Sequence, residues 1–132
     1  MRPPSKILHV DDDADIRFIT GMALETVGGF TILQCASGRE ALAAAPGFQP
    51  DLLLLDMMMP EMDGYEAMRR IREQARFSKL PMLALTAKAM KDDRAKCIEA
   101  GANDYCSKPI DMAKLTSLLR VWLHKSLPLI PI

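Results

Sequence analysis

Acidic side chains are concentrated where a short apolar run, KILHV at residues 6–10, ends in Asp11, Asp12 and Asp13. Two carboxylates held about 4 Å apart repel each other by roughly 4 kcal/mol at an effective dielectric constant of about 20. A fold that gathers such acids must let water screen them or must supply a counter-charge. Three more residues with suitable chemistry lie at the end of later apolar runs or just after one: Asp56, Thr86 and Lys108.

This set of residues favours phosphoryl chemistry assisted by a metal ion. Carboxylates without nearby His or Cys ligands suit a hard divalent cation, and Mg²⁺ fits best because it keeps several waters and uses few carboxylates. Bound Mg²⁺ would neutralise an incoming phosphoryl group. Lys108 would supply a fixed positive charge and Thr86 a hydroxyl donor, while Asp56 is the acid best placed to form an acyl phosphate.

Five short apolar runs alternate with longer amphipathic segments, which predicts an α/β fold with a parallel sheet between two layers of helices. Strands are expected at 6–10, 30–36, 51–56, 81–86 and 104–107, and helices at about 14–27, 37–45, 64–75, 90–100 and after 111. Ligands of such sheets gather beyond the carboxyl ends of the strands. Four of the five strands therefore bring the acids, the hydroxyl and the ammonium group to one edge.

Periodicity and capping residues predict how the first and last helices lie. In the first, Ile16, Ile19, Ala23 and Val27 fall on one face, and Asp13 is expected to cap the N-terminus. The last helix carries an apolar stripe and follows a potential cap at Asp111. Its members are Met112, Leu115, Leu118, Leu119, Trp122 and Leu123. A histidine on the first strand, His9, is expected to pack in the core.

Composition excludes several classes of function. The chain has 132 residues, 49% of them hydrophobic, and its 17 basic and 17 acidic residues give a net charge of zero. The chain therefore lacks the excess of basic residues that would indicate direct nucleic-acid binding. Three cysteines without CxxC spacing argue against a disulfide or zinc framework. The absence of a signal-like start and of an apolar run of about 20 residues predicts a cytoplasmic protein without membrane contact.

Four segments in order resemble the signatures of the response-regulator receiver domain, the CheY-like phosphoacceptor of two-component signalling. They are VDDDADIR, LLLLDMMMPEMDGYE, LALTAKA and AGANDYCSKPI. The resemblance extends from Lys6 to about Lys125, and the last segments are similar to receivers of hybrid histidine kinases. It implies a flavodoxin-like, doubly wound (βα)5 sandwich of strand order 2-1-3-4-5. Residues 6–125 are expected to form the domain, with an N-terminal extension at 1–5 and a tail or truncated linker at 126–132.

The resemblance also implies roles for individual residues. Asp56 would accept phosphate from a histidine kinase or a histidine phosphotransfer protein. Asp12 would bind Mg²⁺ directly and Asp11 largely through water, and the backbone carbonyl of Met58 would complete the protein ligands together with Asp56. Lys108 would pair with the phosphate.

Further positions match the switch of the family. Thr86 and Tyr105 would move together after phosphorylation, Ala87 would lie beside the phosphate, and Pro109 matches a position where a cis peptide is common. The fourth helix, fifth strand and fifth helix would form the face that binds a downstream protein. Contact candidates on that face are Lys88, Met90, Lys91 and Lys114.

Three alternatives compete with a phosphorylated receiver. A phosphohydrolase with an Asp nucleophile would place a second acid two residues after Asp56, where this chain has Met58. A flavin-binding protein would need a hydroxyl- and glycine-rich loop after the first strand, where this chain has acids. A degenerate receiver would have lost part of the acid, threonine and lysine set. Met58 and Lys88, which flank the phosphate in the family, offer no acid or amide to orient water, so slow self-dephosphorylation is expected.

Overall fold

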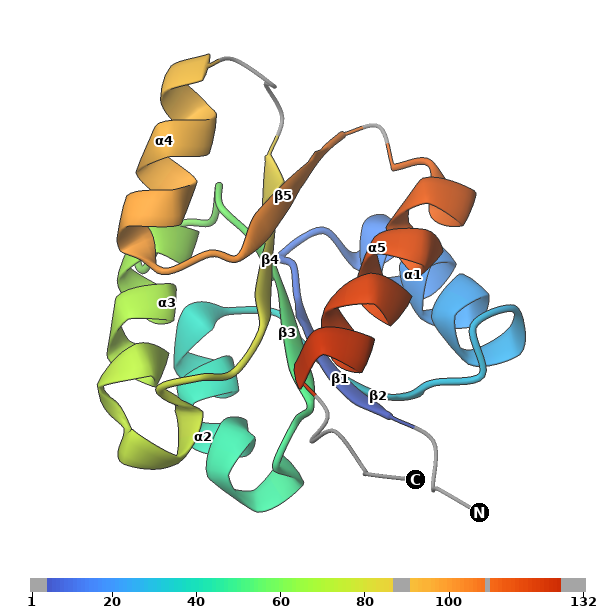
Figure 1. Ribbon diagram of the computed structural model, residues 1–132, viewed down its shortest axis with the longest axis horizontal. Coiled ribbons are helices and arrows are strands. Elements are labelled where there is room, and N and C mark those ends of the chain that lie inside the picture. Colours follow the sequence, from blue (N-terminus) through green and yellow to red (C-terminus); the bar gives the residue numbers. More distant parts are fainter. Residues whose placement is uncertain (1–4, 87–90, 109, 127–132) are drawn as a thin grey trace.

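The computed structural model describes residues 5–86, 91–108 and 110–126, and Figure 1 shows their arrangement. Strands and helices alternate along the chain, as predicted. The strands are β1 (Lys6–Val10), β2 (Thr31–Cys35), β3 (Leu52–Asp56), β4 (Met82–Thr86) and β5 (Asp104–Ser107). The helices are α1 (Ala14–Thr26), α2 (Gly38–Phe48), α3 (Gly64–Glu73), the 3-10 turn η1 (Ala75–Phe77), α4 (Lys91–Ala100) and α5 (Met112–Ser126).

All strand pairs are parallel, and the sheet order is β2-β1-β3-β4-β5. β1 and β3 are both central strands flanked on two sides, which explains why all their residues except Lys6 are buried. The chain reverses direction across the sheet between β2 and β3, and the carboxyl ends of β1 and β3 therefore lie side by side. The predicted flavodoxin-like fold and strand order are confirmed.

Two layers of helices cover the sheet, with α2, α3 and α4 on one face and α1 and α5 on the other (Figure 1). Alternate side chains of the central strands pack into two separate hydrophobic cores, one on each face of the sheet. Leu8, Leu53 and Leu55 pack under the three-helix layer, whereas Ile7, Leu52 and Leu54 pack under α1 and α5. The acids that follow these strands are thus anchored by residues buried on both sides.

Capping side chains fix where the helices begin. Asp13 accepts hydrogen bonds from Asp15 N and Ile16 N at the start of α1, which confirms its predicted role. Ser37 caps α2, and Asp111 Oδ1 accepts from Lys114 N in the first turn of α5. These caps set the direction in which each helix leaves the edge of the sheet.

The end of α2 and the turn after α3 differ from what the sequence predicts. α2 continues beyond residue 45 to Phe48 with Pro46 inside it, and it ends where Gln49 adopts a left-handed conformation with φ of 53°. Only one potential intrahelical donor is missing at Pro46, and the helix continues for two more residues beyond it. The turn η1 was not predicted, and it is held by Arg72, whose Nη1 donates to the carbonyl oxygens of Phe77 and Ser78.

Within the part of the chain that the structure describes, no helix has the length and apolarity needed to cross a membrane. The three cysteines, Cys35, Cys97 and Cys106, are buried and free. His9 is also buried, and its burial lowers its pKa to about 4. Its Nδ1 lies 3.0 Å from Gln34 Nε2 on the neighbouring strand, so the expectation of a packed core histidine is confirmed.

Candidate functional site

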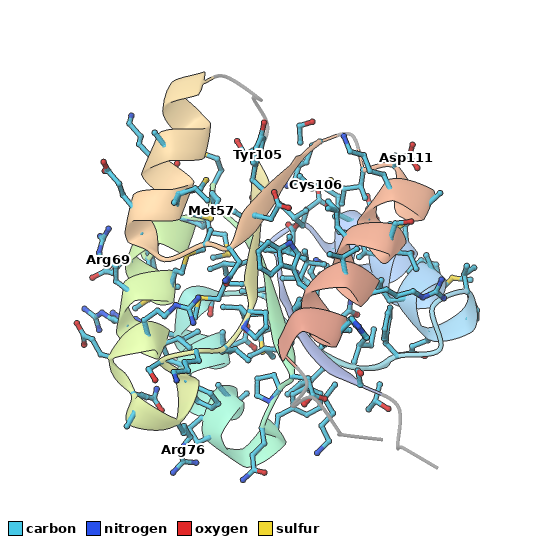
Figure 2. The ribbon with its side chains drawn as sticks, viewed as in Figure 1. Met57, Arg69, Arg76, Tyr105, Cys106 and Asp111 are labelled. Carbon is cyan, nitrogen blue, oxygen red and sulfur yellow. The ribbon has the colours of Figure 1, made fainter. Side chains whose placement is uncertain are left out.

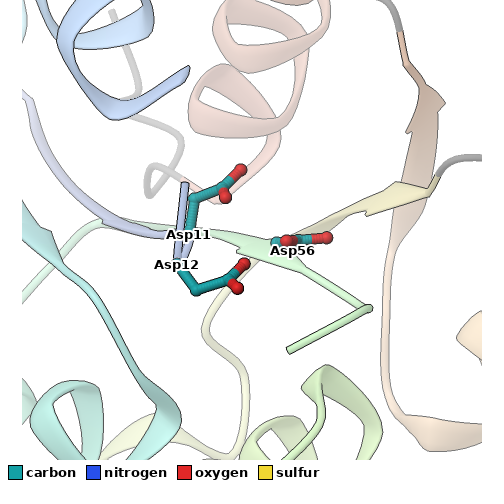
Figure 3. Close-up of side chains that lie close together, drawn as sticks. All are labelled: Asp11, Asp12 and Asp56. Carbon is teal, nitrogen blue, oxygen red and sulfur yellow. The ribbon is translucent and has the colours of Figure 1, made fainter. Parts of the chain in front are cut away.

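Three carboxylates meet at the carboxyl edge of the sheet. Asp11 and Asp12 follow β1 directly, and Asp56 is the last residue of β3. Because Val10 is paired with Leu55, the next residue of each strand lies alongside the other. Figure 3 shows the three side chains leaving these strand ends toward the same side, and one oxygen of each lies within 4.8 Å of the others. The predicted gathering of these acids is therefore found.

Hydrogen bonds hold the loops that carry the acids. Asp11 Oδ1 accepts from Asp13 N at 2.9 Å, and its backbone oxygen accepts from Arg17 Nη1 at 2.6 Å. Asp56 Oδ1 accepts from Met58 N at 3.1 Å. Asp11 and Asp56 are buried, while Asp12 is exposed to solvent. The site thus has two buried acids and one acid that is open to solvent.

Lys108 supplies the counter-charge. Its Nζ lies 3.4 Å from Asp11 Oδ2 and 3.4 Å from Asp56 Oδ1. The backbone places it there, because Lys108 N donates to Thr86 O at 2.8 Å just beyond the end of β4. One ammonium group faces three carboxylates, so the cluster keeps an excess of negative charge.

Burial raises the pKa of Asp56 from its ordinary value of 3.8 to about 6. The hydrogen bond from Met58 N and the charge of Lys108 act in the opposite direction, and the neighbouring Asp11 adds to the increase. Taking a carboxylate out of water disfavours its charged form, and a second carboxylate nearby disfavours it further. A cation placed among these acids would offset both effects.

The donor set fits a hard divalent cation such as Mg²⁺. Asp11 Oδ2 is buried, and apart from the ion pair with Lys108 Nζ at 3.4 Å it receives no hydrogen bond from the described residues, although such an oxygen normally has a donor. The nearby oxygens of Asp12 and Asp56 provide the oxygen ligands that Mg²⁺ prefers. When bound there, the cation would supply charge neutralisation for a phosphoryl group and its acceptor.

The remaining predicted residues lie around this cluster. Thr86 ends β4 and is 6% exposed. Tyr105 lies on β5, half-buried against the core under α2, α3 and α4 (Figure 2). The side chain of Met58 is 71% exposed in the loop after β3. Ala87 and Pro109, with the contact candidates Lys88 and Met90, lie outside the described residues.

Sequence reasoning did not single out Arg17 or Gln34. Gln34 Nε2 donates to Arg17 O at 2.6 Å, and Arg17 in turn binds the backbone oxygen of Asp11. Together they connect β2, α1 and the first acid. The one signal in the sequence that could have identified Arg17 is its position as a basic residue in the first turn of the helix that follows the three aspartates.

Replacing Gly64 with alanine is expected to lower the free energy of unfolding by about 1–3 kcal/mol, the usual cost of forcing extra atoms into a packed site. A Cβ at Gly64 would lie 2.6 Å from Asp56 O and 2.6 Å from Met57 Cα, both backbone atoms. Urea unfolding measures the effect. Gly47→Ala is the matched control, because a Cβ there meets nothing within 4 Å and alanine favours the helix. Equal stability of the two variants would contradict the prediction.

A doubly wound parallel sheet that collects three carboxylates and a lysine at its carboxyl edge defines a class of cation- and phosphate-binding α/β proteins. Comparison with known families specifies the class: the response regulator receiver domain matches residues 7–120. The chain therefore belongs to the response regulator receiver family, the signalling domains of two-component systems, and is not an enzyme in the ordinary sense. The family predicted from the sequence motifs is confirmed.

Relatives with similar sequences include proteins of two lengths. A 14.6 kDa protein of Leptolyngbya boryana is 40% identical over 114 residues, which cover 86% of each chain. The DNA-binding transcriptional regulator RpaA of Synechocystis sp. is 34% identical over 121 residues, which cover 92% of this chain and 50% of RpaA. The chain thus spans about half the length of RpaA and of several other curated relatives.

Solved structures include a receiver domain with its metal. The receiver domain of a sensor histidine kinase from Pseudomonas aeruginosa PAO1 is 34% identical, with a TM-score of 0.85 over 92% of this chain and 99% of that one. That structure has a magnesium ion coordinated in its active-site cleft. Together with the acid cluster of this chain, it supports the prediction of Mg²⁺ as the cofactor.

Proposed function

We propose that the chain is a phosphorelay switch in which Asp56 accepts a phosphoryl group from a histidine kinase or a histidine phosphotransfer protein. The observation that carries the proposal is the position of Asp56 beside Asp11, Asp12 and Lys108 at one edge of the sheet. A carboxylate with a pKa of about 6 is mostly ionised at pH 7 and available as a nucleophile.

In the proposed reaction, a carboxylate oxygen of Asp56 attacks the phosphorus of the donor as the bond between phosphorus and the donor nitrogen breaks. Lys108 leaves its pairing with Asp56 Oδ1 to pair with a phosphoryl oxygen, which needs little movement because the ammonium is already 3.4 Å away. The hydroxyl of Thr86 donates to another phosphoryl oxygen. Asp11, Asp12, Asp56 and the carbonyl of Met58 are the residues that would hold Mg²⁺.

The switch follows from the new charge on Asp56. Movement of Thr86 toward the phosphoryl group leaves space that Tyr105 fills. Phosphorylation then shifts the population between two conformations only as far as it favours one of them. We propose that the face of α4, β5 and α5 reads out this shift by binding a protein partner, with Lys114 among its contacts.

We also propose that residues 6–125 form the phosphorylated domain, flanked by residues 1–5 and 126–132. The protein is proposed to act in the cytoplasm, without binding nucleic acid or membrane directly. The balance of 17 basic and 17 acidic residues supports the absence of nucleic-acid binding, because binding to a phosphate backbone needs a basic surface.

Incubation with acetyl phosphate, followed by intact mass measurement, tests the proposed phosphoacceptor. The wild-type protein is expected to gain one phosphoryl group in Mg²⁺ and none in EDTA, and Asp56→Asn is expected to gain none under either condition. Asp13→Asn is the control, because Asp13 caps α1 and does not belong to the acid cluster. Phosphorylation of Asp56→Asn, or uptake by wild type without Mg²⁺, would contradict the proposal.

A further inference from the structure

We propose that Met58 is a reversible oxidation site whose sulfoxide form shortens the lifetime of the phosphoryl group on Asp56. The inference rests on the proposed function, because it concerns the acyl phosphate of that residue. The oxidant is of the hypohalous acid class, and methionine sulfoxide reductases restore the thioether. The site would let oxidative conditions turn the switch off.

The loop after β3 presents one methionine to solvent and hides the others. Met58 is 71% exposed, whereas Met57 is 2%, Met59 is 8% and Met62 is 7% exposed. Susceptibility of sulfur to oxidants follows its exposure. Among the other described methionines, only Met22 on α1 is comparably open, at 53%. Met58 is therefore the oxidisable sulfur of this loop.

The backbone between Asp56 and Met58 is held by hydrogen bonds. Met58 N donates to Asp56 Oδ1 at 3.1 Å, and Met57 O accepts from Gly64 N at 3.3 Å. The adjacent Met57 side chain is buried in the core under α2, α3 and α4. A chemical change on the Met58 side chain thus takes place on a held loop, two residues from the phosphoacceptor, and does not require the loop to move.

The proposed reaction transfers one oxygen atom from hypochlorous acid to the sulfur. The sulfur–oxygen bond forms, the oxygen–chlorine bond breaks, and chloride and a proton leave, so sulfur is oxidised and chlorine is reduced by two electrons each. The thioether is only a weak hydrogen-bond acceptor, whereas the sulfoxide is polar and binds water. Water bound by the sulfoxide would be held on the residue whose backbone N–H already donates to Asp56 Oδ1, and hydrolysis of the acyl phosphate consumes water.

The experiment treats the intact protein with increasing amounts of hypochlorous acid, up to complete oxidation of Met58, and maps sulfoxides by peptide mass. Loss of the phosphoryl group is then followed after acetyl phosphate and Mg²⁺ are removed. Met58 is expected to be oxidised before the three other methionines of its loop. Its oxidation should shorten the half-life of the acyl phosphate by about fivefold, as expected for one hydrogen bond that orders the attacking water. Methionine sulfoxide reductase should restore the original half-life.

Two variants locate the effect. Met58→Leu cannot be oxidised at this position, so the ratio of its half-lives before and after treatment should stay at one, each sample serving as its own reference. Met22→Leu removes the other exposed sulfur and should respond as wild type does. A shortened half-life in Met58→Leu, or an unchanged one in protein with Met58 fully oxidised, would overturn the proposal. Oxidation of the buried methionines before Met58 would also overturn it. Failure of the untreated protein to take up phosphate is a different result, because it contradicts the proposed function and leaves the order of methionine oxidation measurable.

Discussion

In metal-free buffer, Asp56→Asn is expected to raise the free energy of unfolding at pH 7 by up to roughly 3 kcal/mol. The pKa of Asp56 is about 6 in the folded protein and 3.8 ordinarily, and the difference between these values corresponds to roughly 3 kcal/mol. The folded state therefore binds a proton on Asp56 more tightly than the unfolded state does. The asparagine keeps an oxygen for Met58 N without the unfavourable charge.

The sign of this effect predicts a specific pH dependence. Because the folded-state pKa is raised, the stability that the protonated carboxyl contributes is fully present below about pH 4 and is lost as pH rises through about 6. Wild type should therefore lose stability relative to Asp56→Asn across this window, and the two should converge below it. Urea unfolding in EDTA from pH 3.5 to 7.5 measures both curves.

The control for this experiment is Glu99→Gln, which removes an exposed carboxylate of α4. It should shift stability little at any pH, because charges in water interact weakly. Adding Mg²⁺ should stabilise wild type more than Asp56→Asn, since a ligand that binds only the folded state stabilises it by an amount that rises with the logarithm of its affinity. A wild type that is more stable than Asp56→Asn at pH 7 in EDTA would contradict the raised pKa.

The acid cluster was predictable because it depends on strand ends alone. Once the strands at 6–10 and 51–56 were recognised from apolar runs, the parallel arrangement placed Asp11, Asp12 and Asp56 at one edge. The position of Lys108 follows in the same way from β5. These residues lie where short, regular elements stop, and periodicity locates such points well.

The orientation of α1 was not predictable in the same way. The stripe of Ile16, Ile19, Ala23 and Val27 suggested one apolar face, yet Ile19 is 61% and Val27 is 74% exposed. The buried residues are instead Thr20, Gly21 and Leu24. Gly21 lies against Gln34, where an added Cβ would come within 2.9 Å of Oε1, so close packing of a small residue decided the face. Hydrophobicity alone carries no information about that contact.

Lys108→Met is expected to tighten Mg²⁺ binding by at least about tenfold, while stable phosphorylation at Asp56 is lost. The Lys108 ammonium lies 3.4 Å from oxygens of Asp11 and Asp56 and competes with a metal for the same carboxylates. Charges a few ångströms apart in a partly buried site interact by several kcal/mol, so removing the competing cation favours Mg²⁺. The phosphoryl group loses the ammonium charge of Lys108 that would pair with it.

Without metal, the same substitution should lower the free energy of unfolding at pH 7 by about 3 kcal/mol, because two buried carboxylates lose their counter-charge. The loss should shrink as pH falls, since protonation of Asp56 removes the unpaired charge. Lys108→Arg keeps the positive charge and should retain most of the stability. Calorimetric Mg²⁺ titration, urea unfolding and intact mass after acetyl phosphate give the three readouts. Weaker Mg²⁺ binding by Lys108→Met would mean that the lysine organises the acids for the metal, and that its competition with the metal is the smaller effect.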